Sequence, residues 1–587
     1  MSTEDTERTT RDADSNRWST GRRGLLRTVG VGLGGLALTG TGVTAATTAT
    51  TDCAAGPEIR TYAGGTVNFG RIRAEEAGGT PPADAFAAST PPGADERVPG
   101  AAESARLAAR ETDDGDGPLS VRTEYDGVTA EDTRGGVPSD SQVAAGTGTV
   151  VHALNQQVAI YSAQSGEREQ MVRLERIWEP VIDEPEGGFA FGIPFVFDPR
   201  ARYDREADRY VICATQFEPG LTADGELVGR EDLEEEVEGD GDFEATLARP
   251  PRGWFVVAVS ATSNPNGEWH VYRIPPLENE GLVDYPTLGH DRDAVYLTQN
   301  FFGREFEVTL LALDKAAMYA GEDVTAAHFR RLQDPGEGAP FTFTVQPAQQ
   351  PFSGGESGTF YLVNSGLRSD ALTLWELTDP LSDPTLTCHT LDANVDPYAF
   401  PPAAEQPGTD ALIDTIDTRL MNADYDDGSL WTAHAIRYDP DDGDPVAAIR
   451  WYEIDVESRS VVQQGTYGEP DRSYFLPTVG ADDGRTVIVH NVSGPQTFVR
   501  MDVAGRRVGH EPGELEDAFV VEEGKSPYDY GEGFDVMRWG DYNGVSVDPA
   551  SGRFWTVSQY SPDVDVPPEA DERDPYYTRI AEVDFEG

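Results

Sequence analysis

Lysine is nearly absent from this chain of 587 residues. Only Lys315 and Lys525 occur, so arginine supplies almost all of the 45 basic side chains, which face 104 Asp and Glu residues for a formal net charge of -59. A surface this negative repels phosphate backbones and anionic lipid headgroups, which excludes nucleic-acid binding and electrostatic binding to membrane surfaces. In molar salt the Debye length is only about 3 Å, so the composition suits a protein dissolved in concentrated salt.

Cysteine and the common catalytic motifs are also scarce. The three cysteines, Cys53, Cys213 and Cys388, are too few for a disulfide scaffold of the small secreted kind. Cys213 follows Tyr-Val-Ile and is predicted to lie in the core on a buried strand. The eight histidines show no metal-ligand spacing, and Gly-x-Ser-x-Gly, Walker and dinucleotide-binding motifs are missing. Nucleotide and hydride chemistry are therefore disfavoured, and neither a histidine metal site nor a required cofactor is predicted.

Helical periodicity is also rare in this sequence, and residues 314–321 are the best candidate for a helix. From residue 139 onward, short runs of Val, Ile, Tyr, Phe and Trp are separated by Asp, Gly, Pro and Asn, which indicates an all-β protein. Hydrophobic residues make up 38% of the chain and include 24 Phe and 22 Tyr. That supply is enough for a sizeable core, so disorder throughout the chain is excluded.

One strand-turn-strand plan recurs along the β-rich region. Each copy has a short apolar strand, an Asp-rich turn and a strongly apolar strand, and a further strand pair follows it. The copies begin at residues 141, 198, 285, 417, 476 and 541, and residues 342–391 form a seventh unit without the turn motif. Four strands per repeat predict a β-propeller of about seven four-stranded blades over residues 139–587. A pair of β-sandwiches is the alternative, and it would not require the repetition.

The N-terminus resembles a twin-arginine export signal. Arg22 and Arg23 are followed by a Leu-Leu pair and by an apolar stretch over residues 28–46. The resemblance implies that residues 1–52 are a signal peptide, that the twin-arginine machinery is a partner, and that the folded protein is exported to the cell surface or the medium. Cys53 lies just beyond this signal, and whether it accepts a lipid stays open.

Two further segments are acidic and poor in large apolar residues. Residues 53–138 are rich in Ala, Gly, Pro, Asp and Glu and are predicted to be a largely disordered spacer, with a possible strand at 119–125. Residues 221–248 interrupt a strand-rich region and are predicted to be a solvated loop insertion of the propeller.

The motif Ser546-Val-Asp548-Pro-Ala-Ser-Gly552-Arg-Phe-Trp555 resembles the Asp-box of sialidase-like propellers. In such a hairpin the carboxylate accepts backbone N–H bonds, the glycine adopts positive φ and the aromatic residue packs beneath. In that family the box is structural. As a whole, residues 139–587 resemble exported propeller proteins that are distantly sialidase-like, and the acidic, lysine-poor composition resembles that of haloarchaeal proteins.

A second resemblance concerns Tyr272-Arg273-Ile274-Pro275, which is similar to the [FY]-R-I-P motif of sialidases. The resemblance implies that Arg273 binds a substrate carboxylate. The alternative from the residues themselves is that Arg273 is a surface residue on an outer strand.

Polar residues at the starts of the innermost strands are the main candidates for a site, because innermost strands line the central channel of a propeller. The candidate ligand-binding residues are Arg538, Asp541, Tyr542, Arg419, Tyr285 and Arg273, and the candidate catalytic carboxylates are Asp541, Asp198 and Asp417. In the alternative, these side chains pair with one another and cap strands. A channel cation such as Ca²⁺ is a further hypothesis, although residues 422–428 lack the glutamate of a calcium loop.

Three functions remain open on this basis. The first is an exported or cell-surface propeller that binds an extracellular ligand, a carbohydrate or another polymer, on the face where the inner strands begin. The second is an exported glycoside hydrolase of sialidase type that uses paired carboxylates at the propeller mouth. The third is a structural surface protein that mediates protein contacts. Whether the chain is an enzyme is not decided by its sequence.

Overall fold

The structure, a computed structural model, describes the greater part of the chain. It covers residues 53–72, 118–133, 138–185, 188–189, 193–222, 227–228, 247–303, 305–335, 342–350, 358–366, 370–441, 443–529, 536–563 and 576–586. The predicted signal peptide, residues 73–117 of the predicted spacer and residues 229–246 of the acidic insertion lie outside the described residues. No helix within the covered ranges has the length and apolar character needed to cross a membrane.

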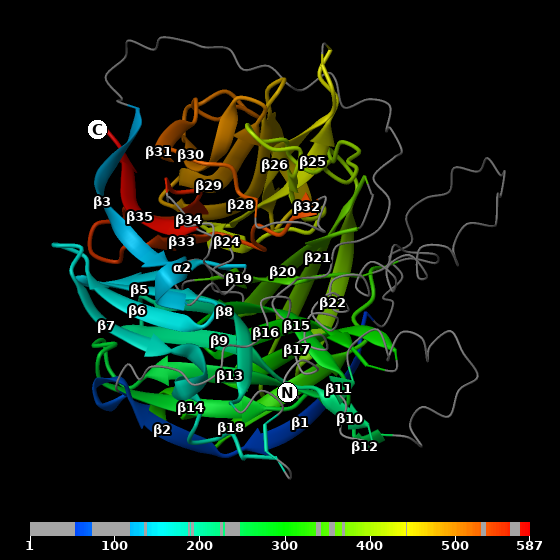
Figure 1. Ribbon diagram of the computed structural model, residues 1–587. Helices are drawn as coiled ribbons and strands as arrows, with labels where there is room; N and C mark the ends of the chain where they lie inside the picture. The colour runs from blue at the N-terminus through cyan, green and yellow to red at the C-terminus, as the bar shows by residue number, and fades with distance from the viewer. Residues whose placement is uncertain are drawn as a thin grey trace, which may run out of the picture.

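Antiparallel pairing groups most of the described strands into seven four-stranded units, which are the blades of a propeller (Figure 1), and short parallel contacts between inner strands join blades 3, 4 and 5 into one larger sheet. Blade 1 consists of β4 (Gln142–Gly146), β5 (Thr149–Leu154), β6 (Gln157–Ser162) and β7 (Arg168–Arg173). Blade 2 consists of β8 (Phe195–Asp204), β9 (Arg209–Glu218), β13 (Arg252–Ser260) and β14 (Glu268–Ile274). Blade 3 consists of β15 (Leu282–His290), β16 (Ala294–Phe302), β17 (Phe306–Asp314) and β18 (Val324–Arg330).

The remaining four blades follow in chain order. Blade 4 consists of β19 (Gln346–Gln349), β20 (Thr359–Ser365), β21 (Leu372–Thr378) and β22 (Thr385–Leu391). Blade 5 consists of β24 (Ala423–Asp426), β25 (Ser429–Tyr438), β26 (Val446–Asp455) and β27 (Ser460–Tyr467). Blade 6 consists of β28 (Ser473–Asp482), β29 (Arg485–Gly494), β30 (Thr497–Arg507) and β31 (Phe519–Glu522). Blade 7 consists of β33 (Gly544–Val547), β34 (Phe554–Tyr560), β35 (Tyr577–Phe585) and β3 (Leu119–Thr129).

The prediction of an all-β propeller with about seven four-stranded blades is therefore confirmed. The helix expected near residues 314–321 is α5 (Lys315–Ala320), which Asp314 caps by accepting from the Ala317 N–H at 3.1 Å. Cys213 lies fully buried on β9, as its sequence neighbours predicted.

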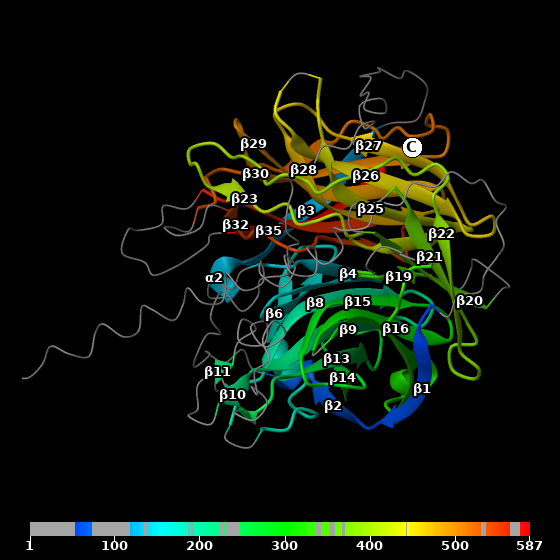
Figure 2. The same cartoon turned by 90° about the vertical axis from the view of Figure 1, so that its right-hand side faces the viewer.

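The predicted spacer differs from the structure where it is described. β3 pairs with β35 and supplies the outermost strand of the last blade, while β1 (Ala55–Tyr62) and β2 (Gly64–Asn68) add fifth strands to blades 3 and 2 (Figure 2). These segments therefore belong to the propeller, which includes strands that precede the domain boundary expected at residue 139. β1 has a burial pattern that is exposed almost throughout, so no apolar alternation marked it as a strand.

Short elements fill the connections. The ends of the predicted insertion form a small sheet of β10 (Gly220–Thr222), β11 (Leu227–Val228) and β12 (Leu247–Arg249). Three single turns, η1 (Phe69–Arg71), α2 (Ala130–Thr133) and α3 (Leu174–Ile177), follow strands. β23 (Leu412–Ile413) and β32 (Val536–Met537) pair in parallel between two long connections.

Three inner strands begin with the same backbone device. Asp198-Pro199, Tyr285-Pro286 and Leu476-Pro477 each sit at a bulge in the first half of β8, β15 and β28. Proline has no N–H for the ladder, and the residue before it has a φ of 54°, 52° and 53° respectively. The bulge changes the side-chain register, which turns Asp198 and Tyr285 toward the channel end.

Neighbouring blades are joined at Arg200, Thr287 and Thr478, two residues beyond these bulges, and at the corresponding positions of the other inner strands. The side chain there donates a hydrogen bond to a main-chain carbonyl of an adjacent blade. The contacts run from Arg200 to Pro286, Thr287 to Val345, Gln346 to Leu420, Asn422 to Val479, Thr478 to Asn543, Asn543 to Leu476 and Gln142 to Asn543, at 2.6 to 3.3 Å. Arg202 of blade 2 donates to the Gln142 side chain of blade 1 at 2.9 Å and completes the ring. This ring of buried polar contacts fixes where the inner strands begin, and therefore where the candidate site residues converge.

Candidate functional site

The inner strands bring most of the predicted site residues together at one end of the channel. Asp541 precedes β33, Asp198 lies on β8 and Tyr285 on β15, and their exposed fractions are 0%, 1% and 0%. Tyr285 and Tyr542 meet edge to face with ring centroids 5.7 Å apart. Residues from blades 2, 3 and 7 therefore share one buried cluster.

Three carboxylates of this cluster come from three consecutive blades. Asp140, Asp198 and Asp541 each offer an oxygen, and these oxygens all lie within 4.8 Å of one another. Asp140 accepts from the Asn155 amide at 2.7 Å and from the Asp541 backbone N–H at 2.7 Å. Burial raises the pKa of Asp140 well above the usual range of an aspartate, although Arg538 and Arg200 lie near enough to lower it. Asp140 was not among the predicted site residues, because its strand start lacks the Asp-rich turn.

Arginine side chains fill the space between the tyrosines. The Arg200 guanidinium lies 3.3 Å from the centroid of the Tyr542 ring and 4.7 Å from that of Tyr285. The Arg419 guanidinium lies 4.4 Å from the centroid of the Tyr285 ring. Stacked cations and rings of this kind pack a channel tightly, since a desolvated guanidinium on an aromatic face is favourable.

The arginines are also paired with acids. Arg419 donates through Nε to both carboxylate oxygens of Asp417 at 2.9 Å, and both side chains are fully buried. Arg538 forms ion pairs with Asp541 and, at 3.4 Å, with Asp414. The geometry thus matches the alternative in which the polar residues at the strand starts pair with one another. These guanidiniums are not positioned to hold a substrate carboxylate.

Two connections cover this end of the channel. We call them the cap: residues 398–421, between blades 4 and 5, and residues 523–529 and 536–541, between blades 6 and 7. The Gln406 side chain exchanges hydrogen bonds with the Tyr528 backbone at 2.8 Å, and Trp539 packs edge to face on Tyr528 at 4.7 Å. Cap residues Ile413, Met537 and Trp539 share one hydrophobic cluster with Tyr285 and Tyr542. The predicted site at the propeller mouth is therefore closed over, because hydrophobic packing covers the candidate carboxylates.

Arg273 lies apart from the other predicted residues. It stands on β14, the outermost regular strand of blade 2, where its Nε donates to Gln216 at 2.8 Å. Its guanidinium lies 3.8 Å from the centroid of the Trp254 ring, and burial lowers the pKa of Arg273 to about 10. The structure therefore agrees with the placement of Arg273 on an outer strand and does not bring it to the arginines of the channel.

The hairpin of the Asp-box-like motif has the local contacts that its residues imply. The Asp548 carboxylate accepts from the backbone N–H groups of Ala550 at 2.7 Å and Ser551 at 3.3 Å. Gly552 has a φ of 68°, and Trp555 is buried in the cluster between blades 7 and 1. Ser546 accepts from the Ala145 N–H at 2.9 Å, which ties this turn to blade 1. Each contact supports the fold and none faces the channel end.

The carboxylate cluster has the donor chemistry of a site for a hard cation. The charged groups around it are the carboxylates of Asp140, Asp198, Asp284 and Asp541 and the guanidiniums of Arg200 and Arg538. Acid outnumbers base in this buried space, and carboxylate oxygens are ligands that Ca²⁺ prefers. Carboxylate oxygens that already accept one hydrogen bond keep a second lone pair for a metal. Asp140, Asp198 and Asp541 are the residues that would hold the ion.

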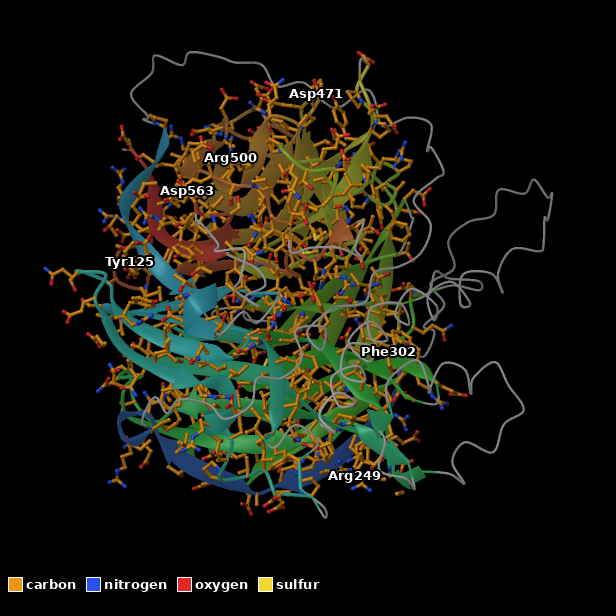
Figure 3. The ribbon with its side chains drawn as sticks, viewed as in Figure 1. Tyr125, Arg249, Phe302, Asp471, Arg500 and Asp563 are labelled. Atoms are coloured by element: carbon orange, nitrogen blue, oxygen red, sulfur yellow. A yellow bond between two sulfur atoms is a disulfide. The ribbon has the colours of Figure 1, made fainter. Side chains whose placement is uncertain are left out.

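Sequence reasoning missed an open pocket on the same face of the propeller. It lies where β15 and β17 begin and β16 and β18 end, and its volume is about 530 Å³. Its lining residues are Leu277, Glu278, Asn279, Glu280, Phe301, Glu305, Glu307, Arg330 and Arg331. Phe302, which follows Phe301 at the end of β16, is labelled in Figure 3. Four chain segments up to 50 residues apart build this pocket, and none carries a motif.

The pocket is lined by charged side chains that pair across it. Arg330 forms ion pairs with Glu278 at 3.0 Å and with Glu307 at 2.8 Å. Arg331 forms an ion pair with Glu305 at 3.0 Å. Four glutamates face two arginines, so the pocket carries an excess of negative charge.

The comparisons with known proteins concern shape. No protein-family model matches the sequence. No curated protein matches it either. Among solved structures, a mutant of Trypanosoma rangeli sialidase is 10% identical with a TM-score of 0.32, over 68% of this chain and 56% of its own. This chain thus spans only about half the length of that sialidase.

Two further solved structures have similar scores. The polysaccharide lyase Uly1 is 10% identical with a TM-score of 0.33, over 76% of this chain and 90% of its own. The WD40 domain of SCAP from fission yeast is 8% identical with a TM-score of 0.31, over 75% and 94%. TM-scores this low say nothing about function, and the assignment of blades rests on the strand pairing described above.

Proposed function

We propose that this protein is an exported or cell-surface propeller that binds a carbohydrate polymer in the pocket over blade 3. The single observation that carries the proposal is that this pocket opens on the face where the inner strands begin, while the channel on the same face is capped. A polar pocket of about 530 Å³ has the size of small-molecule sites and accommodates one or two sugar rings. The strongly acidic, lysine-poor surface supports work in concentrated salt outside the cell.

The chemistry of the pocket favours a neutral or amino-bearing sugar. Sugar hydroxyls donate to carboxylates and accept from guanidiniums, and the half-buried Leu277 offers the pocket an apolar contact. The excess of glutamate repels an anionic sugar such as a sialic acid or a uronate. A cationic amino group would gain from the same excess.

A sialidase-type hydrolase acting at the channel mouth is disfavoured by the same geometry. The candidate carboxylates Asp541, Asp198 and Asp417 are at most 1% exposed. Arg419 and Arg538 are engaged with Asp417 and Asp541, so they do not face a bound anion. A purely structural surface protein remains an outcome of the test below.

The test is binding to a glycan array in molar KCl, followed by calorimetry with the strongest oligosaccharide. Arg331→Ala and Glu280→Ala alter exposed pocket residues, and Arg459→Ala is the matched control because Arg459 forms a similar exposed ion pair with Glu376 on blade 4. We expect the pocket variants to lose about ten-fold or more in affinity, or about 1.4 kcal/mol, and the control to bind as the unaltered protein does.

Two outcomes would overturn the proposal. Unchanged binding in both pocket variants would move the ligand elsewhere, and the absence of any glycan binding would leave a structural surface protein. Chromogenic glycosides in the same buffer separate the hydrolase, since turnover that Asp541→Asn abolishes while the variant stays folded at the assay temperature would establish it.

Export has its own test. Replacing Arg22 and Arg23 with lysine in the expressed full chain should retain the protein inside the cell, whereas the unaltered chain appears outside. Equal export of both forms would contradict the twin-arginine route.

A further inference from the structure

The first described residues of the chain run along the outer edge of blade 3. β1 pairs with β18 in an antiparallel register in which Ala55 lies opposite Arg330 and Tyr62 opposite Val324. Figure 2 shows β1 and β2 as the outermost layer of this side of the propeller. Arg330 is also a wall of the pocket, so the N-terminal strand lies directly beside the proposed ligand site.

β1 by itself is held weakly. Seven of its eight residues are exposed, and Ile59 is 48% exposed, so the strand buries little apolar surface. An edge strand that relies on backbone hydrogen bonds opens at low free-energy cost unless another contact fastens it.

A disulfide supplies that contact. Cys53, two residues before β1, is bonded to Cys388 on β22 of blade 4, across a sequence separation of 335 residues. The Cys53 carbonyl accepts from the Gln333 backbone N–H at 2.8 Å, and the Cys388 sulfur lies 3.8 Å from the Gln333 carbonyl oxygen. Gln333 is therefore held between the two cysteines.

The segment that ends at Gln333 carries both arginines of the pocket. Arg331 has a φ of 52°, in the left-handed region that a non-glycine residue rarely adopts. Leu332 donates to the Val308 carbonyl at 3.1 Å, which holds the segment against β17. A strained backbone persists only where its surroundings fix it, and here the fixed points are Leu332 and Gln333.

From these contacts we infer that the Cys53–Cys388 disulfide is a latch that positions Arg330 and Arg331 in the wall of the pocket. The bridge fastens the N-terminal strand to blade 4 and thereby holds residues 330–333 in the conformation that places both guanidiniums against Glu278, Glu305 and Glu307. The consequence for ligand binding rests on the proposed function; the ordering of residues 330–333 does not.

The latch also bears on the fate of Cys53. A sulfur in a disulfide carries no thioether, so the bridged protein is not anchored through a lipid on Cys53. The two alternatives for this residue are mutually exclusive.

The test compares the Cys53→Ser/Cys388→Ser double variant with the unaltered protein by amide hydrogen exchange in molar KCl. Cys213→Ser is the control, because Cys213 is the free, buried cysteine and its loss leaves the bridge intact. We expect exchange at residues 330–333 to accelerate by about ten-fold or more in the double variant and to stay unchanged in the control. Affinity for the oligosaccharide should fall in the double variant alone.

Two outcomes decide the matter. Unchanged exchange at residues 330–333 in the double variant overturns the latch, whatever the ligand result. Faster exchange with no glycan binding by the unaltered protein supports the latch and rejects the proposed function. If the double variant fails to fold, the same exchange measurement on the unaltered protein with a phosphine reductant replaces it, and mass spectrometry under non-reducing conditions shows whether Cys53 and Cys388 are bridged.

Discussion

The side-chain amide of Gln142 donates a hydrogen bond to the main-chain carbonyl of Asn543 at 2.6 Å, and this contact joins the first blade to the last. β3 closes the same ring on the outside, because it precedes blade 1 in the chain yet pairs with β35 of blade 7 (Figure 1). A ring closed on its inner and outer sides opens only when both contacts are lost.

We predict that Gln142→Ala destabilises the protein by about 1 to 3 kcal/mol, because the Asn543 carbonyl and the Arg202 guanidinium lose a buried partner. Thermal unfolding in molar KCl measures this. Gln496→Ala is the control, since Gln496 is exposed at the turn between β29 and β30. Equal midpoints for the two variants would show that the inner contact does not hold the ring.

The ion pair between Arg538 and Asp541 makes a second prediction. Arg538→Met should destabilise by about 3 to 5 kcal/mol, because it leaves the buried Asp541 carboxylate without its ion pair, whereas Asp541→Asn should cost less, because Arg538 keeps Asp414. The double variant should lose less than the sum of the two. Unfolding free energies of the four proteins form a double-mutant cycle, and additive losses would contradict the pair.

His152 makes stability depend on acid pH. It is fully buried, neither of its ring nitrogens has a hydrogen-bond partner among the described residues, and burial lowers its pKa to about 3. In the unfolded chain His152 has a pKa near 6.5 and binds a proton below that pH, whereas in the folded chain it stays neutral until the pH is near 3. The contribution of His152 is intact above about pH 6.5 and is lost as the pH falls toward about 3, by about 1.4 kcal/mol per pH unit.

The measurement for His152 is the unfolding free energy between about pH 7 and pH 4. His152→Phe keeps a ring of similar size without the titration, so its stability should fall less steeply over this range. The half-buried pair His510 and Glu516 offers a control, and His510→Phe should leave the slope closer to that of the unaltered protein. Parallel curves for His152→Phe and the unaltered chain would contradict the prediction.

A cation at the carboxylate cluster is testable by its removal. We predict that dialysis against EDTA lowers the unfolding midpoint and that added Ca²⁺ restores it. The unfolding free energy should rise by about 2.7 kcal/mol when the ion is in about hundred-fold excess over its dissociation constant. Asp198→Asn should abolish the calcium dependence because it removes one of the three facing carboxylates. Asp427→Asn, at an exposed position of the turn between β24 and β25, should retain it. If the unfolding midpoint of the unaltered protein does not change with calcium, the site is rejected.

The sequence alone was sufficient for the fold class, the approximate number of blades, helix α5 and the burial of Cys213. These features are local or repeated: a period of four strands, a run of apolar residues between Asp-rich turns and a capping aspartate are visible within short windows. It also identified Asp198, Tyr285, Asp541 and Tyr542 as residues that meet, because equivalent positions of a repeat converge at the channel.

Tertiary structure alone decided whether that meeting point is open. Burial of Asp541 depends on Trp539 and on the cap segment around Ile413, more than 120 residues away in the chain, and hydrophobic contacts at such separation leave no periodic signal. The same holds for β1, an exposed edge strand held by backbone pairing and the Cys53–Cys388 bridge, and for the pocket whose arginines and glutamates come from separate turns of blade 3. Repetition in the sequence specified the blades; long-range packing between unlike segments determined which part of the propeller face a ligand reaches.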